Sequence, residues 1–187
     1  MKNIVIAILL SALIAAPALA DSTGKFYLAG DLGAARYSGV NVSLGTFPDS
    51  GVKRIAFGYH ISPTLAAEVG YSRFGDSTLV AGAVTGTLSA SSLQIAAIGS
   101  YPLDPEFDLI GKLGLASNKS NIDETTSGIP TASGSYSQRD LLLGLGGQYN
   151  INPHFGLRAL YDRHGKFTKL SNSMKASSYS LGLAYNF

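Results

Sequence analysis

The last ten residues of the chain alternate strictly between two kinds of side chain. Large apolar residues take every second position, and small or polar residues take the positions between them: Tyr179, Leu181, Leu183, Tyr185 and Phe187 against Ser178, Ser180, Gly182, Ala184 and Asn186. A period of two is the pattern of a β-strand with one apolar face. The sequence therefore predicts a terminal strand that ends on an aromatic residue. The pattern alone suits both soluble and membrane-embedded sheets.

The first twenty residues have the composition of a secretory signal. Lys2 supplies a positive charge, residues 4–14 are apolar, and Ala18-Leu19-Ala20 is a small-x-small cleavage site before Asp21. The alternative is a transmembrane helix, but the apolar run is short and Pro17 interrupts its end. We therefore expect a signal peptide at 1–20 and one mature domain at 21–187.

The composition of the chain narrows the class of protein. There is no Cys, which excludes a disulfide framework, a thiolate metal site and a lipidated cysteine anchor. Charged residues make up 14% of the chain and there are 22 Gly, whereas soluble domains are usually richer in charge. The formal net charge of +2 gives no reason to expect nucleic acid binding. After the signal, no apolar stretch is long enough for a spanning helix, so a membrane protein of this kind must be a closed barrel.

Short and long connections alternate along the rest of the chain. Seven further segments show the strand pattern: 26–34, 55–61, 65–71, 93–101, 107–115, 141–149 and 155–161. Three connections between them are short and contain Pro with Ser, Asp or Asn, which form turns readily. Four are long and rich in Ser, Thr, Gly and Asn, near 36–52, 73–90, 117–138 and 163–176. The sequence predicts an all-β, eight-stranded antiparallel up-and-down barrel with four long loops.

The asymmetry of the connections distinguishes two eight-stranded folds. Outer-membrane barrels have short periplasmic turns and long external loops, whereas a soluble lipocalin-like barrel has no such systematic difference. The secretion signal and the terminal Phe187 also favour the membrane fold, because such a final strand resembles the assembly signal of bacterial outer-membrane barrels. We therefore expect a Gram-negative outer-membrane protein with both termini in the periplasm, assembled through its last strand by the barrel assembly machinery.

Several short motifs resemble the OmpA-type transmembrane domain. They are GYHISP at 58–63, EVGY at 68–71, KLG at 112–114 and GGQYNINP at 146–153, with Phe26-Tyr27 and Leu32-Gly33 in the first strand. The resemblance covers nearly the whole mature chain through spaced motifs. Two features depart from it: Ile98 stands where an inward lysine is expected, and the chain stops at the barrel without a peptidoglycan-binding domain. No role in tethering the cell wall through that domain is expected.

Charged residues recur on the strand faces that would point into the barrel. Glu68 and Arg158 each lie four residues after a short turn, on strands opposite each other in an eight-stranded ring. The interior of such a ring is narrow, so the two side chains can meet as a charge-assisted pair. Lys112, Asp31 and Gln148 can join this network. Buried charges need partners wherever they occur, which favours a lumen plug. The resemblance implies the alternative, a gate for small solutes.

The residues around the first short turn also suggest a catalytic alternative. His60, Ser62 and Glu68 invite comparison with outer-membrane lipid A deacylases, which use a His, a Ser and a carboxylate. These residues lie at the short-turn end, away from the outer leaflet that holds that substrate. We therefore expect no enzymatic activity, no cofactor and no metal.

Basic residues gather at the long-loop end of the expected barrel. They are Arg36, Lys53, Arg54, Arg73, Lys119, Arg139, Arg163, Lys166, Lys169 and Lys175. Lipopolysaccharide presents phosphates at this level, and Lys and Arg pair with phosphate. We take Arg73, Arg163, Lys53 and Lys166 as candidate phosphate ligands. The alternative is a solvated loop surface, because acidic residues occur there too: Asp49, Asp76, Asp123, Glu124, Asp140 and Asp162.

These expectations lead to a structural role. The chain is expected to support envelope integrity and to display its loops, which on the resemblance can bind host or other cell surfaces. Two aromatic girdles are expected at the lipid interfaces: Tyr71, Tyr161 and Tyr179 outside, and Phe107, Tyr149, Phe155 and Phe187 on the periplasmic side. The alternative role is a narrow solute channel controlled by Glu68, Arg158 and Lys112.

Overall fold

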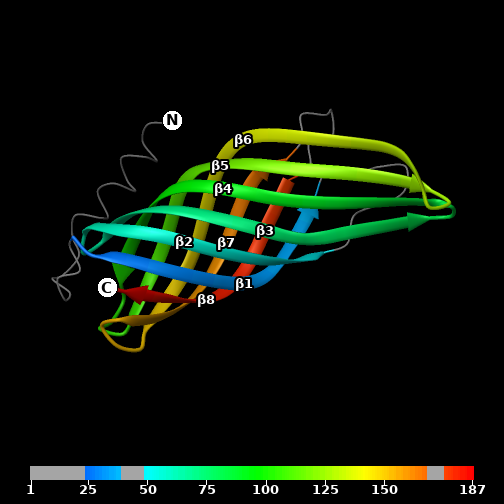
Figure 1. The fold of residues 1–187 in the computed structure, drawn as a ribbon. Helices are drawn as coiled ribbons and strands as arrows, with labels where there is room; N and C mark the ends of the chain where they lie inside the picture. Colours follow the sequence, from blue (N-terminus) through cyan, green and yellow to red (C-terminus); the bar gives the residue numbers. More distant parts are fainter. Residues whose placement is uncertain (1–23, 39–48, 168–174) are drawn as a thin grey trace.

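The computed structural model describes residues 24–38, 49–167 and 175–187 and shows a closed antiparallel barrel. Each strand pairs with the next one in the chain, and β8 pairs with β1 to close the ring (Figure 1). The strands are β1 (Phe26–Ser38), β2 (Ser50–Ser62), β3 (Leu65–Ala81), β4 (Val84–Pro102), β5 (Phe107–Thr126), β6 (Ile129–Asn150), β7 (Phe155–Lys166) and β8 (Lys175–Asn186). No helix in the described ranges is long and apolar enough to cross a membrane. The predicted fold class is confirmed, whereas the predicted signal peptide lies outside the described residues.

The outer wall of the barrel is apolar and the interior is polar. Outward side chains such as Leu32, Ile95 and Leu115 are 64–66% exposed, while buried charges alternate with them on the inward face. The aromatic residues expected in the two girdles are also all exposed on the outside. In water this arrangement would expose a large apolar surface, but in a bilayer lipid tails cover it. The placement is opposite to that of a soluble barrel, which holds its large apolar residues inside.

Three tight turns join strands at one end of the barrel, where the C-terminus also lies (Figure 1). Two of them are held by side-chain caps. The Oδ1 atom of Asp104 accepts hydrogen bonds from the backbone N–H groups of Glu106 and Phe107 at 2.8 and 2.7 Å. Asn152 Oδ1 accepts in the same way from His154 and Phe155, both at 2.9 Å. The short connections therefore form where they were expected.

The prediction of long loops is wrong for two of the four stretches. The stretches 73–90 and 117–138 are mostly strand, and they form two long hairpins that turn at Gly82–Ala83 and Ser127–Gly128. Gly82 and Gly128 have φ angles of 61° and 79°, which glycine adopts without strain. Beyond the membrane neither strand face has to be apolar, so the apolar alternation that marks a spanning strand is lost while the backbone pairing continues.

The hairpins form a four-stranded extension of the barrel wall. Strands β3 to β6 continue past the last register pairs with β2 and β7, which are Val52 with Phe74 and Leu143 with Arg163. Figure 1 shows this sheet projecting away from the short-turn end. The other two expected loops begin later than predicted, because β1 reaches Ser38 and β7 reaches Lys166. Residues 39–48 and 168–174 are outside the described ranges.

Candidate functional site

The centre of the lumen holds a network of buried ion pairs. Arg158 donates from Nε to Asp31 Oδ1 and from Nη2 to Asp31 Oδ2, both at 2.7 Å, which is a bidentate pair. Arg158 Nη1 also donates to Glu68 Oε2 at 3.3 Å. Tyr27 donates its hydroxyl to the same Glu68 oxygen at 3.0 Å. Two arginine-binding carboxylates are thus held in one cross-lumen cluster.

Arg54 completes this cluster from β2. Its Nη1 atom donates to Asp31 Oδ2 at 2.9 Å, and its Nη2 atom donates to Glu68. Asp31 and Arg54 are direct register partners on β1 and β2, so the pair follows from strand pairing. Arg54 and Arg158 therefore share both carboxylates. Replacing either arginine would therefore leave Asp31 and Glu68 with one arginine partner between them.

Lys112 links the cluster to a second group of polar residues. Its Nζ atom lies 3.5 Å from Glu68 Oε1, 3.4 Å from Asp162 Oδ2 and 3.2 Å from Gln94 Oε1. Three carboxylates and three cations are thus buried together, each at most 6% exposed: Asp31, Glu68, Asp162, Arg54, Lys112 and Arg158. Charges removed from water are tolerated only when paired, and the equal numbers make this cluster formally neutral.

Two glycines make room for these contacts. Gly182 on β8 is the register partner of both Asp31 on β1 and Arg158 on β7. A Cβ atom at Gly182 would collide with the Asp31 carboxylate and with the backbone of Gly30. Gly58 on β2 likewise lies under the ring of Tyr27, where a Cβ would overlap the ring. The missing side chains let Asp31 reach Arg158 across β8 and let Tyr27 reach Glu68.

The structure groups the predicted lumen residues only in part. Asp31, Glu68, Lys112 and Arg158 meet, but Gln148 does not reach them: it is half-buried and donates to Asn150 Oδ1 at 2.8 Å. Gln148 is the register partner of Arg158, but its side chain lies against Gly156 and hydrogen-bonds Asn150, so the expectation that it joins the network is wrong.

Two network members were wrongly assigned to the long-loop end. Arg54 and Asp162 are buried in β2 and β7, because these strands extend beyond the predicted segments 55–61 and 155–161. Continued alternation carried the signal: Arg54 is in phase with Ala56 and Gly58, and Asp162 with Arg158 and Leu160.

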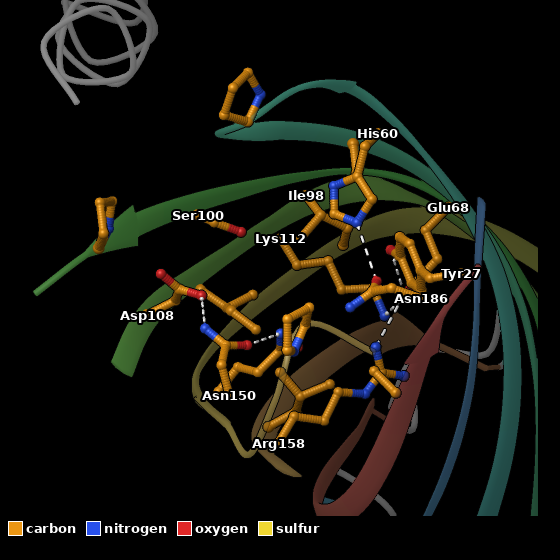
Figure 2. A pocket seen from close by; sticks show the side chains of 18 of the residues that line it. Tyr27, His60, Glu68, Ile98, Ser100, Asp108, Lys112, Asn150, Arg158 and Asn186 are labelled. Carbon is orange, nitrogen blue, oxygen red and sulfur yellow. Dashed lines mark hydrogen bonds and ion pairs between the residues drawn. The ribbon is translucent and has the colours of Figure 1, made fainter. Parts of the chain in front are cut away.

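A cavity of about 310 Å³ lies between the network and the short turns. Figure 2 shows its lining, with Lys112, Arg158 and Glu68 among the labelled side chains. Turn prolines line it as well: Pro63, Pro102, Pro105 and Pro153. Asn150 Nδ2 donates to Asp108 Oδ2 at 2.7 Å across its rim (Figure 2). The lumen therefore has a vestibule at the short-turn end, lined by both polar and apolar side chains.

The vestibule does not assemble the catalytic arrangement considered above. His60 Nε2 lies 3.4 Å from Asn186 Oδ1, and Ser62 Oγ accepts from the backbone N–H of Thr64 at 3.3 Å. Glu68 is engaged by two arginines and Tyr27. In the described part of the chain, no hydrogen bond joins His60, Ser62 and Glu68 to one another.

An apolar layer closes the lumen on the other side of the network. Phe74, Leu88 and Phe167 are at most 1% exposed, and the rings of Phe74 and Phe167 meet edge to face with centroids 5.5 Å apart. Beneath them, His164 contacts the Phe74 ring and lies 2.8 Å from Ser178 Oγ through Nε2. The long loop expected near 163–176 includes His164, and for this residue the expectation is wrong, because His164 is fully buried in β7.

The outward residues named from the sequence lie on two flanks. Lys53 and Arg73 are register partners on β2 and β3, whereas Arg163 and Lys166 lie on β7. In the last strand, Tyr179, Leu181, Leu183, Tyr185 and Phe187 all face outward and are 38–64% exposed. The backbone N–H of Phe187 donates to Phe26 O at 3.0 Å, so β8 joins β1 up to its end.

Comparison with solved structures places the fold among small outer-membrane barrels. Ail, the attachment invasion locus protein of Yersinia pestis, is 18% identical with a TM-score of 0.60, over 88% of this chain and 99% of Ail. Neisserial surface protein A is 23% identical with a TM-score of 0.62, over 87% of this chain and 97% of that protein. The N-terminal barrel domain of Pseudomonas aeruginosa OprF is 17% identical with a TM-score of 0.54, over 88% and 100%.

At these identities the structures establish the fold alone, and a comparison with curated protein sequences found no match. The model of one family, described as outer membrane protein beta-barrel domain, matches residues 6–187. This match and the apolar outer wall place the protein in the Gram-negative outer membrane. The chain belongs to the outer membrane protein beta-barrel domain family.

Proposed function

We propose that this protein is a structural outer-membrane barrel that supports the envelope and displays a sheet at the cell surface, without enzymatic activity. The observation that carries the proposal is the four-stranded extension of β3 to β6 beyond the ring. In the orientation of the family, with short turns in the periplasm, this extension lies outside the cell. Such a rigid sheet holds a binding surface at a fixed distance from the membrane.

The interior supports a structural role over transport. A neutral network of six buried charges fills the middle of the lumen, and the layer of Phe74, Leu88 and Phe167 covers it. Each layer removes space that a solute would need. The channel remains the second candidate because the vestibule gives small molecules access to the network from the short-turn end.

A polyanion is the first ligand to test on the displayed surface. Lys53, Arg73 and Lys119 lie on one outward row of the wall, with Ser91 between the last two in the register. None of the three has an ion-pair partner within the described ranges. One Ail structure contains the heparin analogue sucrose octasulfate, which makes immobilised heparin a suitable probe here.

Two membrane partners complete the proposal. Lipopolysaccharide contacts the outward cations, since phosphates and basic side chains meet at the external boundary. The barrel assembly machinery engages β8, whose outward face is apolar up to Phe187. Both partners act on the barrel, independently of the hairpin tips.

The test separates envelope support from surface display. A strain lacking the gene receives either the full chain or a variant in which residues 80–85 and 123–133 are each replaced by Asn-Gly, a residue pair that forms tight hairpin turns. Both should restore resistance to detergent, because both retain the ring. The trimmed variant keeps the row of Lys53, Arg73 and Lys119, so it should bind a mammalian cell layer more weakly than the full chain does, without losing binding altogether. Equal binding by the trimmed variant would contradict the display role, and unrestored resistance by both would contradict the structural role.

Heparin binding is tested with a triple variant that removes the outward row of cations: Lys53→Ser, Arg73→Ser and Lys119→Ser. We expect it to lose retention on heparin at physiological salt while it keeps the mobility of a folded barrel in gels. A triple variant with full retention would remove this surface as the polyanion site.

A further inference from the structure

A groove crosses the lipid-facing wall where β6, β7, β8 and β1 lie side by side. Its floor consists of small residues or bare backbone: Gly33, Gly146, Gly147, Ala159 and Ser180. Larger side chains form its rim: Leu32, Leu145, Tyr161, Tyr179 and Leu181. Tyr161 and Tyr179 are direct cross-strand partners, and their ring centroids are 4.9 Å apart. The groove therefore lies beside a tyrosine pair of the expected external girdle.

Three cations lie on the same two strands just beyond this tyrosine pair. Arg163 follows Tyr161 by two positions on the outward face of β7 and pairs in register with Ser177. Lys166 and Lys175 are direct cross-strand partners further along β7 and β8. Like charges directly opposite each other destabilise a sheet. Within the described ranges none of the three forms an ion pair.

The adjoining polar groups leave this patch basic. Arg36 on β1 is the other register partner of Ser177, and it already pairs with Asp49 at 3.1 Å. Asp140 on β6 uses its carboxylate to accept from the backbone N–H groups of Leu141 and Lys166 at 2.8 and 2.9 Å. Asp49 is thus neutralised by Arg36, whereas Asp140 keeps its negative charge beside Lys166, and the three cations still leave the patch with a net positive charge.

We propose that the groove and the three cations together bind one lipopolysaccharide molecule through its lipid A. An acyl chain lies in the groove against Ala159 and its register partner Gly147, and a lipid A phosphate is held by Arg163 with Lys166 and Lys175. Charge complementarity identifies this occupant: a lipid with phosphates above acyl chains matches cations above an apolar groove, and Arg and Lys both bind phosphate strongly. This inference rests on the proposed membrane orientation and lipopolysaccharide contact, and it specifies the site.

The opposite flank offers a matched control. Lys53 and Arg73 are also like charges in direct register, and they lie just beyond Ile55 and Tyr71. The large outward side chains of Ile55 and Tyr71 are exposed, and the groove on the wall of β6, β7, β8 and β1 does not include them. Both flanks thus carry paired outward cations, but only the flank of β7 and β8 has a groove beside them.

The experiment titrates refolded full-length mature barrel in detergent with lipid A carrying two sugar residues of the inner core, and counts bound lipid by native mass spectrometry. Arg163→Ser with Lys166→Ser is compared with Lys53→Ser and Arg73→Ser, which remove the same charge. Ala159→Leu fills the groove floor, and Ala97→Leu adds the same bulk on the outward face of β4. Each protein is also titrated with dephosphorylated lipid A and with phosphatidylglycerol.

The site predicts a specific pattern. The Arg163 and Lys166 variant and the Ala159 variant should each weaken the first binding event about tenfold, as expected when a charge-assisted contact is lost. The Lys53 and Arg73 variant also loses cations that can meet phosphate, but it should weaken the first binding event much less than the Arg163 and Lys166 variant, because no groove adjoins that flank. Ala97→Leu should bind as the wild type does, and dephosphorylated lipid A should bind weakly to all. Equal loss in both charge variants would overturn the assignment to this flank while leaving lipopolysaccharide contact intact. Unchanged binding in every variant would contradict both the groove site and the proposed lipopolysaccharide contact. Equal binding of phosphatidylglycerol and lipid A would overturn lipid A as the ligand.

Discussion

Arg54 and Asp31 face each other across the first strand pair of the barrel, with Arg54 Nη1 2.9 Å from Asp31 Oδ2. The same aspartate binds Arg158 on β7 in bidentate fashion. Asp31 therefore joins β2 to β7 through the lumen, although only β2 and β8 neighbour β1 in the sheet. The network stabilises the ring across its interior as well as along its seams.

Loss of one network cation should destabilise the barrel strongly. Arg54→Met leaves three buried carboxylates with two cations, and breaking a buried pair costs about 3–5 kcal/mol. Unfolding by urea in lipid vesicles, followed by tyrosine fluorescence, measures this change. Arg36→Met is the control, because it breaks the exposed pair with Asp49 and should change stability by less than about 1 kcal/mol. Similar losses for both variants would mean that the lumen pairs contribute no more than a surface pair.

A methyl group at Gly182 should disturb the same contact. Gly182→Ala places a Cβ against the Asp31 carboxylate and nearby backbone, and overpacking of this kind costs about 1–3 kcal/mol. Gly30→Ala is the matched control on the neighbouring strand, because a Cβ there meets nothing within 4 Å. The measurement is the urea midpoint of both variants. If Gly182→Ala is as stable as Gly30→Ala, the close packing at β8 does not constrain the network.

Conductance should require opening of two layers. Glu68→Ala removes one carboxylate but keeps Phe74 and Phe167, so we expect no discrete channels in planar bilayers. Phe74→Ala with Phe167→Ala opens the apolar layer but leaves the charges, and should also stay silent. The variant with all three changes should conduct. Channels in Glu68→Ala alone would support the gate over the plug, because the ion pairs would then be the only barrier.

The terminal aromatic residue should affect assembly more than intrinsic stability. Phe187→Ser should lower the amount of folded barrel in the membranes of expressing cells several-fold, because the assembly machinery is expected to engage the end of β8. Refolding of the same variant into detergent should proceed normally. Phe155→Ser is the control, since Phe155 is also exposed at the short-turn end and contacts Tyr185. An equal assembly defect in Phe155→Ser would point to lost lipid anchoring instead.

Some features of the fold and of the lumen network could not be predicted from the sequence, because they depend on contacts that the residue pattern does not contain. The hairpins at 73–90 and 117–138 were missed because strands outside lipid need no apolar face, so only backbone hydrogen bonding marks them. Arg54 was missed for a related reason: its strand begins earlier than its apolar pattern, at Ser50. The prediction for Gln148 is wrong although its inward phase and its register with Arg158 suit the network, because its side chain bonds Asn150 instead.

The sequence by itself determined the closed eight-stranded barrel and its short-turn end. A period of two along the spanning strands is imposed by lipid on one side and the lumen on the other. Neighbouring residues show it directly, such as the outward Leu157 and the inward Arg158. Only the tertiary structure decided which charges meet. Register, strand tilt and the absent side chain of Gly182 bring Asp31 to Arg158, 127 positions away, and no local pattern encodes such a distance.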